Sequence, residues 1–155
     1  MRLVLLLIIL CIFPAEAFAW GMGVHLSLGS CLLTAPDSLP VALQALLASQ
    51  PMAFLYGCVA ADITLGKKFT HYLEHCHNWR VGRKILEHAR AEGPRAEACA
   101  YGYLSHLAAD TIAHNYYVPL KLSTTFNTIL HNHAYWEIRA EFGIADDVWS
   151  LAEEL

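Results

Sequence analysis

Apolar residues recur along this chain at intervals of three and four, and short polar, proline- and glycine-containing segments separate the apolar stretches. Residues at this interval share one face of an α-helix, so the pattern predicts amphipathic helices around one core. We find no hairpin signal and no strand-rich region, and we expect an all-α fold, a single helical bundle. After an apolar stretch over 25–35, the expected helices cover 41–49, 52–62, 78–92, 96–116 and 120–142, followed by an amphipathic tail over 146–155.

Prolines and glycines set the expected ends of these helices. Pro40 suits a first helical turn, with Asp37 or Ser38 as its cap. Gly93-Pro94 is expected to end the helix over 78–92, and Val118-Pro119 to break the chain after the central helix. Residues 64–79 are expected to form a loop.

The N-terminus has the pattern of a secretory signal peptide. Arg2 precedes an unbroken apolar run over 3–13, and Ala17-Phe18-Ala19 matches a cleavage signal. We expect cleavage after Ala19, which would leave a mature domain over 20–155 in the periplasm or outside the cell. The alternative is an uncleaved anchor.

Composition narrows the classes of partner. The 155 residues carry a formal net charge of −4, which gives no electrostatic basis for binding duplex DNA. No glycine-rich nucleotide-binding motif is present. Four cysteines follow the expected cleavage site, and their even number permits disulfides as well as buried free thiols. They are Cys31, Cys58, Cys76 and Cys99.

The strongest chemical signal is three polar residues spaced by four in the predicted central helix. His106, Asp110 and His114 would turn only about 40° from one to the next on an α-helix, so all three are expected to face one side. Imidazole nitrogens and carboxylate oxygens together are ligands that zinc accepts. A central aspartate could bridge two metal ions. The other interpretation is a stripe of hydrogen-bonded polar residues in the core.

A second pair with the same spacing lies further along the chain. His133 and Glu137 share a helix face, whereas His131 points away from it. This spacing brings an imidazole and a carboxylate to one metal ion, although solvent-exposed histidine–glutamate pairs are also common. We expect them to form a metal-binding pair.

Two further candidates follow the apolar run over 57–61. Asp62 ends this run, and a carboxylate there needs a partner, which favours a ligand role. Among the loop histidines we prefer His77 as a ligand, because the next helix begins beside it. His75 is the alternative, and His71 is expected to be exposed.

Cleavage after Ala19 would also make Trp20 the first residue. Its free α-amine and carbonyl oxygen could then chelate a metal ion, with His25 completing the site. The alternative is an ordinary apolar N-terminus.

Taken in order, these candidates resemble the zinc-dependent phospholipase C family, whose helical scaffold is shared by zinc-type single-strand nucleases. The resemblance covers most of residues 20–142. It implies three zinc ions: one held by Asp62, His77, His106 and Asp110; a second by Trp20, His25 and the shared Asp110; a third by His114, His133 and Glu137.

The resemblance also implies a secreted trinuclear-zinc phosphodiester hydrolase, most similar to phospholipase C. Water activated between zinc ions would attack the phosphorus of a phospholipid headgroup, with Asp62 as ligand and general base. We expect a phospholipid or other phosphodiester substrate, transient contact with a membrane surface and no stable protein partner. The chain is short for the family, as in a minimal or C-terminally truncated domain.

Several alternatives stay open at this point. The spacing from Asp110 to His114 looks more like the glycosylphosphatidylinositol phospholipase D branch, which leaves the headgroup and the cleaved bond undecided. A single-strand nuclease or nucleotidase is the second hypothesis. A non-catalytic helical binding module that retains the scaffold is the third.

Overall fold

A computed structural model describes residues 20–63, 71–125 and 132–155. Over these ranges the regular elements are all helices and no strand occurs, which confirms the predicted all-α fold. In chain order they are α2 (Met22–Thr34), η1 (Pro36–Ser38), α3 (Val41–Ser49), α4 (Pro51–Ala60), η3 (Tyr72–Glu74), α5 (Trp79–Glu92), α6 (Pro94–Ile112), η4 (Ala113–Tyr117), α7 (Val118–Thr124), α8 (Asn132–Glu141) and α9 (Asp146–Glu154).

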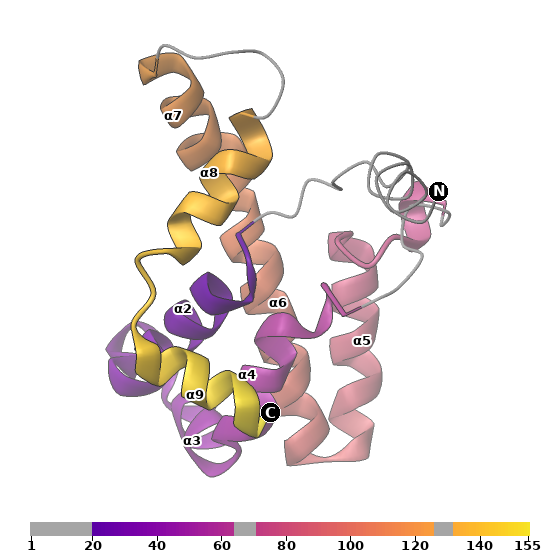
Figure 1. Cartoon of the computed structure of the whole chain (residues 1–155). Coiled ribbons are helices and arrows are strands. Elements are labelled where there is room, and N and C mark those ends of the chain that lie inside the picture. Colours follow the sequence, from indigo (N-terminus) through magenta and orange to yellow (C-terminus); the bar gives the residue numbers. More distant parts are fainter. Residues whose placement is uncertain (1–19, 64–70, 126–131) are drawn as a thin grey trace, which may run out of the picture.

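Helix α6 is the central element of the fold. It packs along α4 and α5, while α2 packs on α4 and also contacts α6, α8 and α9 (Figure 1). Helices α7 and α8 lie together at one end of the molecule, and α3 lies at the other. Because α6 contacts elements from both halves of the chain, its polar residues can meet residues that are distant in sequence.

Two glycines allow α4 and α6 to approach closely. A Cβ atom on Gly57 would lie 2.0 Å from the carbonyl oxygen of Cys99, and one on Gly102 would lie 2.0 Å from that of Phe54. Either methyl group would collide with backbone of the facing helix. The crossing therefore depends on glycine at both positions.

The core lies around this crossing. Apolar residues of α2, α3, α4 and α6 form one buried cluster, and a smaller one links the end of α4 to α6. The first cluster contains Leu26, Leu47, Phe54, Leu55, Cys58, Val59 and Ala98, and the second contains Ala61, Tyr103 and Leu107.

No single helix in the described ranges is long and apolar enough to cross a membrane. Helices α3 and α4 together meet that length and composition but are bent by 94°.

The early helix boundaries agree well with the sequence pattern. Helix α3 has the predicted limits, α4 begins at Pro51, and Gly93 separates α5 from α6 with a φ of 104°. The predicted cap of α3 is wrong: Asp37 and Ser38 lie in η1, and Pro40 itself is the N-cap. Its carbonyl oxygen accepts the N–H groups of Leu43 and Gln44.

The central helix does not break at Val118-Pro119 as predicted. Helix α6 ends at Ile112 and passes through the π-helical turn η4 into α7, with Pro119 in its first turn. Proline has no N–H to donate and its ring crowds the carbonyl group four residues earlier, here that of Asn115. A π-helical turn at that position changes the hydrogen-bond register, so the chain continues as a helix.

The predicted helix over 120–142 is also wrong as one piece. Helix α7 ends at Thr124, and Thr125 has an extended conformation. The hydroxyl groups of Ser123, Thr124 and Thr125 hydrogen-bond to the carbonyl oxygens of Leu120 or Lys121. Such bonds compete with helix continuation. Helix α8 begins at Asn132, and His131 lies outside the described residues.

Candidate metal centre

Five of the nine predicted ligands meet beside the C-terminal part of α6. His25 comes from α2, Asp62 from the turn after α4, and His77 from the segment before α5, while His106 and Asp110 are one turn apart on α6. Two overlapping sets of their donor atoms lie within 4.8 Å of one another: His77, His106 and Asp110; and His25, Asp62 and His106. Segments that are distant in the chain thus form one polar cluster.

The carboxylate of Asp110 lies between three imidazole rings. Its Oδ1 is 3.3 Å from His25 Nε2, and its Oδ2 is 3.3 Å from His106 Nε2 and 3.5 Å from His77 Nε2. The second carboxylate of the cluster is that of Asp62, with Oδ1 at 3.1 Å from His77 Nε2. The Nε2 atoms of His77 and His106 are 3.2 Å apart.

The ring of His106 is fixed by the crossing of α4 and α6. Its Nδ1 is 2.8 Å from the carbonyl oxygen of Cys58 and donates a hydrogen bond to it. His25 stacks on the same ring, with centroids 3.9 Å apart and planes inclined by 17°. A proton at Nδ1 leaves Nε2 as the lone-pair nitrogen, the form that binds a metal ion.

The environment favours a charged Asp110–His106 pair. Burial alone would raise the pKa of Asp110, but contact with His106 and His25 outweighs burial and lowers this pKa well below its usual range. Burial alone would lower the pKa of His106, but the carboxylates of Asp110 and Asp62 and the carbonyl of Cys58 raise it. The carboxylate of Asp110 is therefore ionised at neutral pH.

The donor set fits a zinc ion. It contains imidazole nitrogens and carboxylate oxygens, the ligands of catalytic zinc sites. Both oxygens of Asp110 and both ring nitrogens of His25 are buried without a hydrogen bond of good geometry, although His25 Nε2 is only 3.3 Å from Asp110 Oδ1. Buried polar atoms in proteins are rarely left in this state. A cation among them would satisfy the atoms that face the cluster.

Solvent reaches the cluster from one side. The side chains of His25, His106 and Asp110 are 1%, 0% and 9% exposed, whereas those of Asp62 and His77 are 17% and 20% exposed. Asp62 and His77 therefore form the solvent-exposed rim of the cluster.

Three of the other predicted ligands lie in α8 and η4. Glu137 is buried in α8, 3% exposed, and His133 belongs to the same helix, but its side chain is outside the described part of the structure. His114 lies in η4, where a π-helical turn follows the α-helix, and is exposed. Helices α7 and α8 pack together near it.

Trp20 lies at the start of the described chain. Its ring contacts the ring of Tyr117 edge-on, with centroids 5.7 Å apart. In the uncleaved chain its nitrogen is an amide, so the predicted ligand role of its α-amine depends on cleavage after Ala19.

An acidic residue that sequence reasoning missed holds α2 in place. Helix α2 has no side-chain cap of its own, and the carboxylate of Glu141 in α8 accepts the N–H groups of Gly23 and Val24 at 3.0 and 2.9 Å. This fixes the end of the helix that carries His25. The sequence offers no signal for it, because the partners are more than a hundred residues apart.

The loop before α5 contains two histidines besides His77. His71 is exposed, as predicted, and His75, Cys76 and His77 form a further group of donor atoms within 4.8 Å.

The four cysteines after residue 20 are all free thiols, so the disulfide alternative is not seen. Burial raises the pKa of Cys58 to about 12, which keeps this thiol protonated.

Comparison with known proteins gives one match. The model of a family described as zinc-dependent phospholipase C matches residues 24–154, which is most of the chain and includes the whole cluster. No curated protein and no solved structure matches the chain.

Proposed function

The chain belongs to the zinc-dependent phospholipase C family, and from this premise we propose that it is a secreted zinc-dependent phosphodiester hydrolase of the phospholipase C type. The observation that carries the proposal is the cluster of imidazoles around Asp110, in which the oxygens of Asp110 and the ring nitrogens of His25 are buried without a hydrogen bond. The expected signal peptide over residues 1–19 supports export.

We assign the residues to zinc ions as follows. Asp62, His77, His106 and Asp110 would hold one ion, and the geometry of the cluster supports this set best. His25, the shared Asp110 and the amine and carbonyl of Trp20 would hold a second. His114, His133 and Glu137 would hold a third. Bound zinc supplies Lewis acidity, which lowers the pKa of water and neutralises charge on phosphate oxygens.

The chain's own residues perform the remaining tasks. Asp110, kept ionised by His106 and His25, provides a fixed negative charge in the floor of the site. Asp62 stands at the solvent-facing rim and accepts the proton of the water that attacks phosphorus. The Cys58 carbonyl holds His106 in one orientation, so the cluster needs little rearrangement before reaction.

The test uses the full chain, expressed so that export and processing can occur. N-terminal sequencing identifies the first residue, and elemental mass spectrometry gives zinc per chain. We expect zinc binding and release of phosphorylated headgroup from phosphatidylcholine vesicles. Asp62→Asn should lower the rate by about 100-fold or more, whereas His88→Ala, at an exposed position on α5, should not change it.

Two other results would reject the proposal. Release of mononucleotides from single-stranded DNA without headgroup release would support the nuclease alternative. A folded, processed protein that binds no zinc would support the third hypothesis, a non-catalytic helical binding module.

A further inference from the structure

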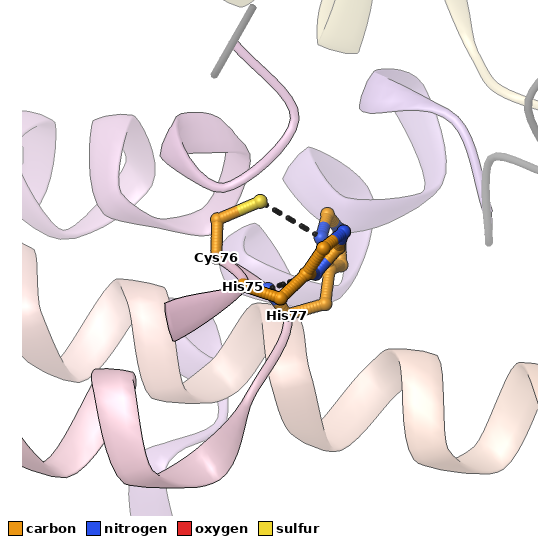
Figure 2. Close-up of side chains that lie close together, drawn as sticks. All are labelled: His75, Cys76 and His77. Carbon is orange, nitrogen blue, oxygen red and sulfur yellow. Dashed lines mark hydrogen bonds between the residues drawn. The ribbon is translucent and has the colours of Figure 1, made fainter. Parts of the chain in front are cut away.

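His77 lies between two different groups of side chains. Its Nε2 faces the metal centre, at 3.1 Å from Asp62 Oδ1 and 3.2 Å from His106 Nε2. Its other ring nitrogen, Nδ1, is 3.2 Å from the sulfur of Cys76 (Figure 2). A hydrogen bond between Cys76 and Nδ1 therefore also affects Nε2, the atom of the same ring that faces the metal centre.

Cys76 is itself held firmly by α6. The hydroxyl of Tyr103 donates a hydrogen bond to the backbone carbonyl of Cys76, and the cysteine is only 8% exposed. Tyr103 precedes His106 by three residues, so it lies about one turn away on the same helix. The next residue is held as well, because the N–H of His77 donates to His75 Nδ1 at 3.2 Å. The backbone of Cys76 and His77 thus has a fixed position relative to the ligands on α6.

The chemistry of the ring shows what the sulfur contributes. A neutral imidazole has one N–H, and Nε2 must be free of it to bind a cation, so Nδ1 then needs an acceptor. Without a cation, Nε2–H can instead donate to Asp62 and Nδ1 becomes an acceptor. A thiol can both accept and donate. The contact between Cys76 and His77 is therefore compatible with both states of the ring.

This differs from the way His106 is held. A backbone carbonyl only accepts, so the Cys58 carbonyl keeps the proton of a neutral His106 on Nδ1 whether or not metal is bound. His77, at the exposed rim, has a partner that tolerates a change of tautomer. Metal entry can then proceed at His77 without loss of its supporting hydrogen bond.

We propose that Cys76 is a positioning residue for the metal centre: its thiol hydrogen-bonds to Nδ1 of His77 and keeps Nε2 directed at Asp62 and His106, the residues with which it would hold zinc. The inference rests on the proposed zinc site. It assigns the sulfur to the support of a ligand and not to the metal ion itself.

The experiment measures zinc affinity in the processed full chain by competition with a chromophoric chelator. Cys76→Ala should weaken zinc binding by about 10- to 100-fold, as is usual when the partner of a ligand histidine is lost. Cys76→Ser should restore most of this loss, because a hydroxyl also donates and accepts. Cys31→Ala, at an exposed cysteine in α2, is the matched control and should bind zinc as the parent protein does.

Two further measurements keep the test decisive if Cys76→Ala fails to fold. Cys76→Val fills the space without a hydrogen bond and should bind zinc as weakly as the alanine variant was expected to. Nitrogen NMR of the zinc-loaded parent protein should show His77 protonated at Nδ1.

Three outcomes would overturn the inference while leaving the zinc site intact: equal zinc affinity in the valine and serine variants, His77 protonated at Nε2 in the loaded protein, or a sulfur-to-metal charge-transfer band of the cobalt-loaded protein that Cys76→Ser abolishes. A parent protein that binds no zinc would instead reject the proposed function, and the inference with it.

Discussion

Asp110 is the residue at which the segments of the metal centre meet. Its two oxygens face different rings, Oδ1 toward His25 and Oδ2 toward His106 and His77. These rings belong to α2, to α6 and to the segment before α5. One carboxylate thus links three parts of the chain, and its charge balances a cluster rich in imidazole.

Replacing this carboxylate by an amide tests its role with little change of shape. Asp110→Asn removes the negative charge and one acceptor oxygen, and an amide is a poor zinc ligand. We expect the loss of at least one zinc ion per chain and a fall in headgroup release of about 100-fold or more. Elemental analysis and an assay on phosphatidylcholine vesicles measure the two effects.

Asp37→Asn is the matched control, since Asp37 is an exposed aspartate in η1. It should leave zinc content and rate unchanged. Full zinc content in Asp110→Asn would contradict a ligand role for Asp110.

Spacing within one helix could be predicted at the residue scale, and contacts between helices could not. His106 and Asp110 follow from their interval of four, because helix geometry alone places them on one face. The carbonyl of Cys58 that orients His106 carries no sequence signal, since every residue has a carbonyl group. Only the crossing of α4 and α6 selects it. The thiol of Cys76 was likewise unassigned, because a short loop fixes its direction.

The crossing of α4 and α6 is the main determinant of the site at the scale of elements. Gly102 lies at the contact, where a Cβ would be 2.0 Å from the Phe54 carbonyl oxygen and 2.9 Å from the Cys58 backbone nitrogen. These are backbone atoms and cannot rotate away. The same contact brings the Cys58 carbonyl to His106, so stability and site geometry depend on the same glycine.

Gly102→Ala should therefore separate the two helices and destabilise the protein by about 1–3 kcal/mol or more. Urea unfolding of the metal-free protein measures the change in unfolding free energy. Zinc affinity should fall too, because His106 loses its fixed partner.

Gly143→Ala provides the comparison. Its Cβ would lie 3.7 Å from the Ala140 carbonyl oxygen, an ordinary contact, and φ at Gly143 is not positive. Its effect should stay within about 0.5 kcal/mol. Equal stability of the two alanine variants would argue against a tight crossing.

Glu141 couples two other elements, α8 and α2. Its carboxylate caps the first turn of α2 from a different helix. A negative charge at this end of a helix also interacts favourably with the helix dipole. Glu141→Ala should destabilise the protein by about 1 kcal/mol, the usual value of an N-cap. Zinc affinity should also weaken, because His25 lies in the same turn. Thermal unfolding and chelator competition measure the two effects.

Glu153→Ala changes an exposed glutamate of α9 and is the control. Glu141→Gln keeps an acceptor oxygen without the charge, so it should lie between the parent protein and the alanine variant. A Glu141→Ala protein as stable as the control would contradict the capping role of Glu141.

Helix boundaries at this scale were predictable where proline or glycine sets them, as at Pro51 and Gly93. The chain after Ile112 was not, because apolar periodicity continues through η4 and α7 while the backbone changes register in η4, before Pro119. The run Ser123-Thr124-Thr125 was the overlooked signal. Its hydroxyls bond to backbone carbonyls at the end of α7, which disfavours continuation of the helix.

At the scale of the whole molecule, the stability of the metal-free protein and the stabilisation by zinc should change with pH in opposite directions near neutral pH. In the metal-free protein the lowered pKa of Asp110 gives a stabilisation that is complete above about pH 4 and is lost as pH falls towards the folded-state pKa. The raised pKa of His106 gives one that is complete below about pH 6.5 and is lost as pH rises through the folded-state pKa. The metal-free protein should therefore be most stable between these two values.

Zinc should oppose the loss of stability at the upper end of this pH range, because it binds imidazoles that have released their protons. From about pH 6 to about pH 8 the melting temperature in chelator should fall, while the increase in melting temperature on adding zinc should grow. Calorimetric scans at four pH values, with chelator and with zinc, measure both trends. Asp110→Asn should flatten both curves, since it removes the charge that raises the pKa of His106. Parallel curves with and without zinc would show that the cluster does not bind the metal through titrating histidines.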